Sequence, residues 1–207
     1  MENILKEFEV LQQNLDNLPI ENLSKTALFI VDINNGFAKE GTLYSDRIKA
    51  LINPIYEFVK PLEDKLNKII AFTDTHEEDS VELLSYPAHC LADSDECKVV
   101  DELLDIKNLE IIPKNSTNGF FAIDINTLND IDNVVVVGDC TDICIYQFVV
   151  TLKAYFNEKN INKNIVVPMN LVDTYDIPFV HPGDLLNVVF LNSMVQNGIK
   201  LIKKFSL

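Results

Sequence analysis

The 207-residue sequence has no tryptophan, only six glycines and three histidines, and 17 basic residues against 32 acidic ones. No G-x-G-x-x-G follows a predicted strand and no G-x-x-x-x-G-K-[ST] occurs, so the dinucleotide-binding fingerprint and the phosphate-binding loop are both missing. The net charge of −15 comes without any stripe of Lys and Arg. A nucleic-acid partner is therefore excluded, because binding a polyanion requires basic side chains that release its counterions.

Long apolar runs are missing too. Every run is shorter than the roughly 18 to 20 residues that a membrane helix needs, so no membrane partner is expected. The first residues carry neither the basic segment nor the apolar segment of a secretory signal, which predicts a cytoplasmic protein. In that compartment Cys90, Cys97, Cys140 and Cys144 are expected to be free thiols.

Short β-branched runs alternate with helical stretches along the chain. Strands are predicted over 26–31, 68–73, 109–112, 134–137, 165–169 and, more weakly, 198–202. Helices are predicted over 45–60 (with Pro54 as a kink or in a first turn), 97–104, 143–157 and 182–196. The run 134–137 is apolar on both faces, as in a central parallel strand. We therefore predict an α/β fold, a three-layer Rossmann-like parallel β-sheet with helices on both faces.

The whole chain, 1–207, is predicted to be a single domain. Residues 1–22 carry apolar side chains at helical spacing, which predicts an N-terminal helix packed on the body.

Chemically capable side chains follow four of the predicted strands. They are Asp32, Asp74 with His76, Lys114, and Cys144. Ligands of parallel α/β sheets bind beyond the carboxyl ends of the strands, so these side chains are expected to meet at one edge.

Cys144 falls at the start of the helix predicted after the fourth strand, where Thr141 or Asp142 could cap that helix. The helix dipole there favours a thiolate, and the strand–turn–helix setting resembles a nucleophile elbow. The alternative is a buried cysteine that acts as a small apolar residue. Asp32 could be a general base for the thiol, a helix cap or a structural acceptor. Lys114 could pair with Asp32, lower the thiol pKa and keep the carboxylate ionised, or it could be an exposed loop lysine.

The segment Asp74-x-His76 places two possible metal ligands on one side of an extended chain, and His89 follows in the same region. Asp with two His suits Zn²⁺, Mn²⁺ or Fe²⁺ with open positions, and Glu82 could add an oxygen. The alternative is a set of solvated loop residues. His181 is expected to be solvated or at an interface.

Together these segments resemble a known family. They are V-D-x-x-x-x-F at 31–37, D-x-H at 74–76, aromatic-P-x-H-C at 86–90, Lys114, and G-x-x-T-D-x-C at 138–144. Over residues 26–202 the chain resembles the isochorismatase-like cysteine hydrolases, and among them the nicotinamidases.

The resemblance implies a catalytic triad, a metal site and an aromatic pocket. The triad would be Asp32, Lys114 and Cys144. The metal ligands would be Asp74, His76 and His89, joined by Glu82 in some relatives. The pair that binds the substrate ring would be Phe37 and Tyr86. A cis peptide at Asp139–Cys140 would turn the backbone N–H of Cys140, with that of Cys144, into an oxyanion hole.

The implied activity is metal-dependent hydrolysis of nicotinamide to nicotinate and ammonia through a cysteine thioester, in NAD salvage, by a homo-oligomer. One divalent metal is implied, Zn²⁺ ahead of Mn²⁺ or Fe²⁺. The acidic segment 91–97 departs from the Gly-containing turn of relatives. That segment is expected to shape the pocket, and Phe120 or Phe121 could enter it or lie in the core. Two alternatives stay open: an amidase for another small carboxamide, and a non-catalytic oligomeric binding protein.

Overall fold

The computed structural model describes residues 22–203 and contains one six-stranded parallel sheet. The strand order is β3-β2-β1-β4-β5-β6. The strands are β1 (Thr26–Val31), β2 (Lys68–Asp74), β3 (Leu109–Lys114), β4 (Asn133–Gly138), β5 (Asn164–Pro168) and β6 (Lys200–Ile202). All six strand predictions are confirmed to within a few residues. The helix predicted for residues 1–22 falls almost wholly outside the described residues.

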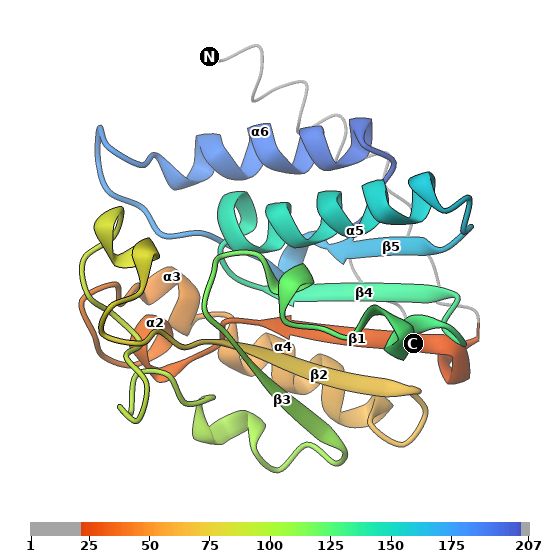
Figure 1. Cartoon of the computed structure of the whole chain (residues 1–207), viewed down its shortest axis with the longest axis horizontal. Coiled ribbons are helices and arrows are strands. Elements are labelled where there is room, and N and C mark those ends of the chain that lie inside the picture. Colours follow the sequence, from red (N-terminus) through yellow and green to blue (C-terminus); the bar gives the residue numbers. More distant parts are fainter. Residues whose placement is uncertain (1–21, 204–207) are drawn as a thin grey trace.

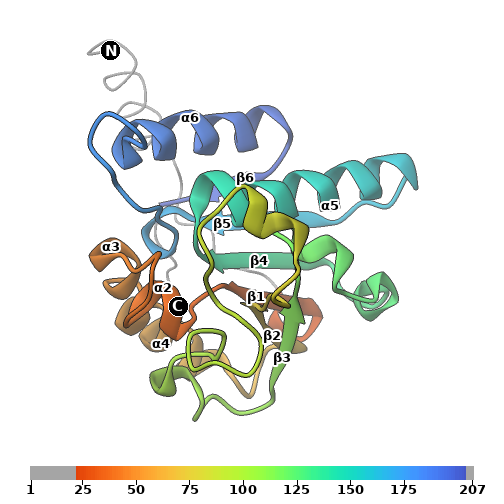
Figure 2. The ribbon, with the colours of Figure 1, turned by 60° about the vertical axis from the view of Figure 1, so that its left-hand side comes forward.

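Helices cover both faces of the sheet (Figures 1 and 2). One face packs against α5 (Tyr146–Glu158) and α6 (Gly183–Gln196), the other against α3 (Asp46–Lys49) and α4 (Ile52–Val59). Successive residues of a strand point to opposite faces, so Phe29 joins the α5 and α6 core while Leu28 joins the α4 core. Every residue of β1 is buried, which explains why the central runs are apolar throughout. The predicted three-layer α/β fold is confirmed.

Three of the helix predictions need adjustment. The stretch 45–60 divides into α3 and α4, with Pro54 in the first turn of α4, where its missing N–H costs nothing. The helix predicted over 97–104 is wrong, because only the 3₁₀ turn Asp101–Leu103 forms. A π-helical turn, Thr141–Ile145, precedes α5, so the regular helix starts later than predicted.

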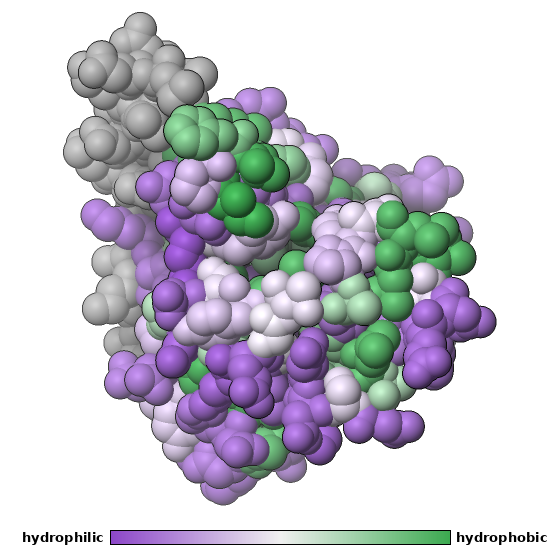
Figure 3. All heavy atoms as spheres, turned by 90° about the vertical axis from the view of Figure 1, so that its left-hand side faces the viewer, coloured by the Kyte–Doolittle hydropathy of each residue, from purple (hydrophilic) through white to green (hydrophobic). Residues whose placement is uncertain are grey.

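All strands run in one direction, so the carboxyl ends of β1, β2 and β4 meet at one edge of the sheet, on the left of Figure 1. The short helix α2 (Asn35–Ala38) follows β1 there. Figure 3 views this edge, where apolar patches at the top and right interrupt a hydrophilic surface. No helix in the described part of the chain has both the length and the apolar character of a membrane span.

Candidate active site

The carboxyl edge brings together the side chains that the sequence placed after the strands. Asp32 directly follows β1 with a left-handed φ of 55°, Lys114 ends β3, and Cys144 lies in the π-helical turn after β4. Asp32 and Lys114 are buried, and Cys144 is 9% exposed. The exposed-loop alternative for Lys114 does not fit this arrangement.

Lys114 is the centre of the cluster. Its Nζ lies 2.8 Å from Asp32 Oδ2, 2.8 Å from Asp74 Oδ1 and 3.9 Å from Cys144 Sγ. Burying a lone ammonium or carboxylate is expensive, and here each charge has a partner of opposite sign. One cation thus connects the carboxylate and thiol of the predicted triad to a predicted metal ligand.

Burial sets the ionisation of the thiol and its neighbour. Loss of water raises the pKa of Cys144 well above its usual range, although Lys114 acts to lower it. Burial also raises the pKa of Asp32 to about 6, against the opposing effect of Lys114. Lys114 acts on the thiol in the predicted direction, but the net pKa of Cys144 is raised, because one lysine shared by two carboxylates does not offset desolvation. The resting site holds a neutral thiol beside a carboxylate that ionises near pH 6.

The turn between β4 and α5 has the expected cis peptide but not the expected helix cap. The Asp139–Cys140 peptide is cis, as the resemblance implied. Neither Thr141 nor Asp142 caps the helix; the backbone N–H of Thr141 donates to Asp173 O, and the Asp142 carboxylate accepts hydrogen bonds from Thr174 and His181. His181 is accordingly mostly buried and hydrogen-bonded instead of solvated.

A second cluster adjoins the first, formed by Asp74, His76 and His89. One possible ligand atom from each lies within 4.8 Å of the others, and all three residues are buried. Asp74 Oδ2 is 2.9 Å from His76 Nε2 and 3.0 Å from His89 Nε2. The alternative of solvated loop residues is therefore wrong.

The donor set fits a divalent transition metal. His76 Nδ1 contacts Asn115 Oδ1 at 3.0 Å, and His89 Nδ1 contacts Pro87 O at 2.7 Å. A ring whose Nδ1–H donates to such an acceptor presents the lone pair of Nε2, which is how outer partners orient metal-binding histidines. Two nitrogens and a carboxylate oxygen therefore point at one spot, a ligand set suited to zinc and its neighbours.

Glu82 lies at the border of this cluster. Its Oε1 is 3.9 Å from His76 Nε2, while its Oε2 accepts a hydrogen bond of 3.0 Å from the backbone N–H of Thr117. Glu82 is therefore close to the cluster, but one of its oxygens is already hydrogen-bonded to the backbone. Asp74, His76 and His89 form the compact ligand set without it.

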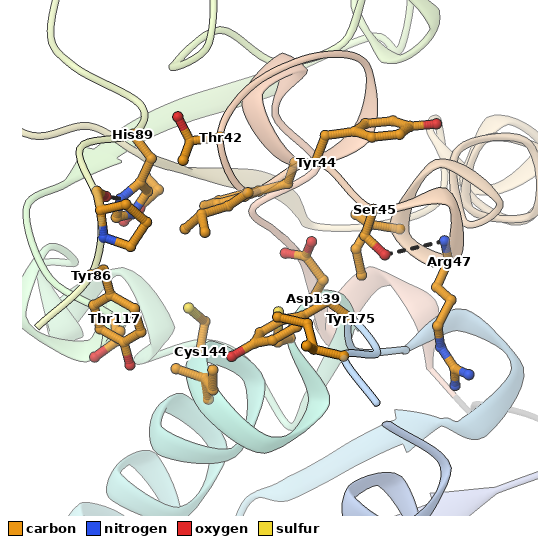
Figure 4. A pocket seen from close by; sticks show the side chains of 18 of the residues that line it. Thr42, Tyr44, Ser45, Arg47, Tyr86, His89, Thr117, Asp139, Cys144 and Tyr175 are labelled. Atoms are coloured by element: carbon orange, nitrogen blue, oxygen red, sulfur yellow. Dashed lines mark hydrogen bonds and ion pairs between the residues drawn. The ribbon is translucent and has the colours of Figure 1, made fainter. Parts of the chain in front are cut away.

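A cavity of about 820 Å³ opens over both clusters. Phe37, Tyr86, His89 and Cys144 line it, and the last three are labelled in Figure 4. The ring centroids of Phe37 and Tyr86 lie 5.7 Å and 6.1 Å from that of His89. The predicted ring-binding pair therefore borders the predicted metal cluster.

Residues 91–97 and the pair Phe120 and Phe121 lie outside the wall of the cavity. None of residues 91–97 lines it. Instead, Glu96 accepts hydrogen bonds from the backbone N–H groups of Gly36 and Cys90, and so supports the segments that carry Phe37 and His89. Phe120 packs against the core and Phe121 is 77% exposed, so neither enters the cavity.

Three residues of the site were missed by sequence reasoning: Asn115, Asp139 and Tyr175. Asn115 follows Lys114 and orients His76. Asp139 lines the cavity while only 1% exposed, and burial, followed by the charge of Asp32, raises its pKa well above the usual range. Tyr175 lines the cavity from the segment after β5, seven residues beyond the last residue of that strand.

Comparisons with known proteins identify the family and the fold of this chain. The sequence model of the isochorismatase domain matches residues 26–172. Nicotinamidase 1 of Arabidopsis thaliana is 27% identical over 214 residues, which cover 88% of this chain and 87% of that protein. The yeast nicotinamidase structure is similar with a TM-score of 0.73 at 16% identity, over 86% of this chain and 100% of that one. The structure of N-carbamoylsarcosine amidase from Thermoplasma acidophilum is similar with a TM-score of 0.72 at 19% identity, over 88% of this chain and 98% of that one. The two structures confirm the fold.

Proposed function

This chain belongs to the isochorismatase domain family and is a cysteine hydrolase of that family, and on that basis we propose that it hydrolyses nicotinamide to nicotinate and ammonia. The observation that carries the proposal is the placement of Cys144 Sγ 3.9 Å from Lys114 Nζ, which is itself 2.8 Å from Asp32, at the wall of an aromatic-lined cavity. The similarity to the Arabidopsis nicotinamidase supports the substrate.

Asp32, Lys114 and Cys144 are the proposed catalytic residues. Asp32 takes the thiol proton of Cys144, and the thiolate bonds to the carboxamide carbon. The charge on the amide oxygen is received by the backbone N–H groups of Cys140 and Cys144. Lys114, whose pKa is raised by Asp32 and Cys144 against the effect of burial, stays protonated and compensates the negative charge.

The proton then moves from Asp32 to the leaving nitrogen, the C–N bond breaks, and ammonia departs from a Cys144 thioester. Asp32 next takes a proton from water, which attacks the thioester carbon. Nicotinate leaves, and the thiol of Cys144 recovers its proton from Asp32. One carboxylate thus serves as base and acid in both halves, which requires a pKa below the working pH but not far below it.

Asp74, His76 and His89 would hold one divalent metal, with Zn²⁺ proposed ahead of Mn²⁺ or Fe²⁺ and Glu82 as an outer ligand. Bound there, the metal supplies a Lewis-acidic centre able to coordinate a ring nitrogen of the substrate. Phe37 and Tyr86 would hold the ring itself. A role in NAD salvage, a cytoplasmic location and homo-oligomers remain predictions.

A second candidate is hydrolysis of a larger carboxamide. The cavity of about 820 Å³ lies in the range of pockets that hold drug-sized ligands, and this size is the observation behind the second candidate.

The test is ammonia release by the purified protein with added Zn²⁺ or Mn²⁺, from nicotinamide and from a panel of larger amides. We expect nicotinamide to be turned over and Cys144→Ala to abolish turnover. The matched control is Cys97→Ala, a thiol outside the cavity, which should keep full activity. Turnover of the larger amides alone would select the second candidate. Full activity of Cys144→Ala would contradict both.

A further inference from the structure

The segment that connects β5 to α6 lies along the turn that carries Cys144. Residues 173–181, named here the connector, begin with Asp173, whose carbonyl accepts a hydrogen bond of 3.0 Å from Thr141 N–H. The backbone N–H of Asp173 donates in turn to Gly138 O at 3.4 Å. The start of the connector is thus bound to the residues on either side of the Asp139–Cys140 peptide.

Asp142 holds the connector at two further points. Its Oδ1 accepts a hydrogen bond of 2.6 Å from Thr174 Oγ1, and its Oδ2 contacts His181 Nε2 at 2.9 Å. The Asp142 and His181 side chains are only 6% and 13% exposed, so water competes little for these bonds. One carboxylate two residues before Cys144 therefore fixes both ends of the connector.

His181 in turn fixes Tyr175. The two rings stack with centroids 3.7 Å apart and an interplanar angle of 18°. His181 Nδ1 also bonds the carbonyl oxygen of Tyr175 at 3.0 Å. The ring stack and the hydrogen bond together hold Tyr175 in place.

That position is inside the cavity. Figure 4 shows Tyr86 and Tyr175 on opposite sides of Cys144, with the hydroxyl end of Tyr175 directed toward it. Burial raises the pKa of Tyr175 to about 12, so the phenol stays neutral and can donate a hydrogen bond. A planar ring held at Cys144 would meet aromatic surface from Phe37, Tyr86 and Tyr175.

We propose that Tyr175 is a specificity-determining residue that selects aromatic over aliphatic carboxamides, and that His181, through Asp142, is the positioning residue that places it. This rests on the proposed function, because it concerns the amide bound at Cys144. Contact between aromatic rings adds selectivity of about three- to tenfold, which an aliphatic amide does not gain.

The first experiment compares KM and kcat for benzamide and propionamide. Tyr175→Ala should raise KM for benzamide about tenfold and leave KM for propionamide and both kcat values within about twofold. His181→Ala should shift selectivity in the same direction, and His181→Phe, which keeps the stack, should restore part of it. Phe179→Ala is the matched control, an exposed aromatic residue on the same connector that does not line the cavity. The proposal would be overturned if Tyr175→Ala raised KM equally for both amides, or if Phe179→Ala raised KM for benzamide as much as Tyr175→Ala does.

A second measurement needs no turnover. Benzamide should protect Cys144 from alkylation by iodoacetamide, measured by mass spectrometry of the Cys144 peptide, and Tyr175→Ala should need about tenfold more benzamide for equal protection. Unchanged protection in Tyr175→Ala, or none in the wild-type protein, would overturn the selectivity proposal. Normal protection without ammonia release would contradict the proposed function alone.

Discussion

Lys114 and Asp74 are register partners on neighbouring strands, and their side chains form a buried ion pair of 2.8 Å. The same ammonium reaches Asp32, so one lysine connects the proposed thiol chemistry with the proposed metal site. The pairing follows from the sheet, since the last residues of β2 and β3 lie side by side. The two clusters are therefore expected to respond together when Lys114 is changed.

Replacing Lys114 with Met should both abolish activity and destabilise the fold. It leaves Asp32 and Asp74 buried without their cation, and breaking such a pair costs about 3–5 kcal/mol. Urea unfolding measures the loss. The control is Lys107→Met, because Lys107 pairs with Asp64 at the surface with 58% of its side chain exposed, and such pairs contribute about 1 kcal/mol or less. Similar losses of unfolding free energy in the two variants would contradict the assignment of Lys114 as the buried partner of Asp32 and Asp74.

Activity should fall as the pH drops through about 6. Burial raises the pKa of Asp32 to about 6, and below that pH the protonated carboxyl cannot accept the thiol proton. The expected result is about a tenfold decrease in kcat/KM per pH unit on the acid side. Profiles of kcat/KM against pH test this. A midpoint near 4 would show that Asp32 keeps the pKa of an exposed aspartate.

Metal affinity should depend on Asn115 as well as on the three proposed ligands. His76→Ala should abolish high-affinity binding of Zn²⁺, because one of the two nitrogens is lost. Asn115→Ala should weaken binding about 10- to 100-fold, since Asn115 orients His76 through Nδ1. Isothermal titration calorimetry with the metal alone gives both constants. Asn115→Ala binding as tightly as wild type would mean that His76 does not need this contact.

Gly138 should not tolerate a side chain. Its φ is 115°, and a Cβ there would lie 2.1 Å from Val31 O, inside the contact of β4 with β1. Gly138→Ala should therefore lose more than about 3 kcal/mol of stability by overpacking and backbone strain. Gly198→Ala is the control, because its φ is also positive at 81° but the nearest atom is the flexible end of Lys153 at 3.2 Å. Urea midpoints that shift equally would contradict the steric explanation.

Local pattern was sufficient for the strands and for the identity of most site residues. The β-branched runs and their turn residues predicted all six strands, and the strand-end rule indicated Asp32, Asp74, Lys114 and Cys144. Tyr175 lies seven residues beyond the end of β5, too far along the chain for a rule about the residues directly after a strand to indicate it. The helix predicted over 97–104 does not form because the backbone there bonds to another segment: Asn35 N–H donates to Lys98 O, and Val100 N–H donates to Ile33 O.

The sequence by itself determined the fold, the family and the set of chemical groups, because periodicity and motif spacing are properties of the chain. Only the tertiary structure decided how these groups ionise and which of them act together. The pKa values of Cys144 and Asp32 depend on loss of water and on charges from other strands, which no local pattern contains. His181 reaches Asp142 only because the connector folds back on the turn after β4, a contact between residues 39 positions apart.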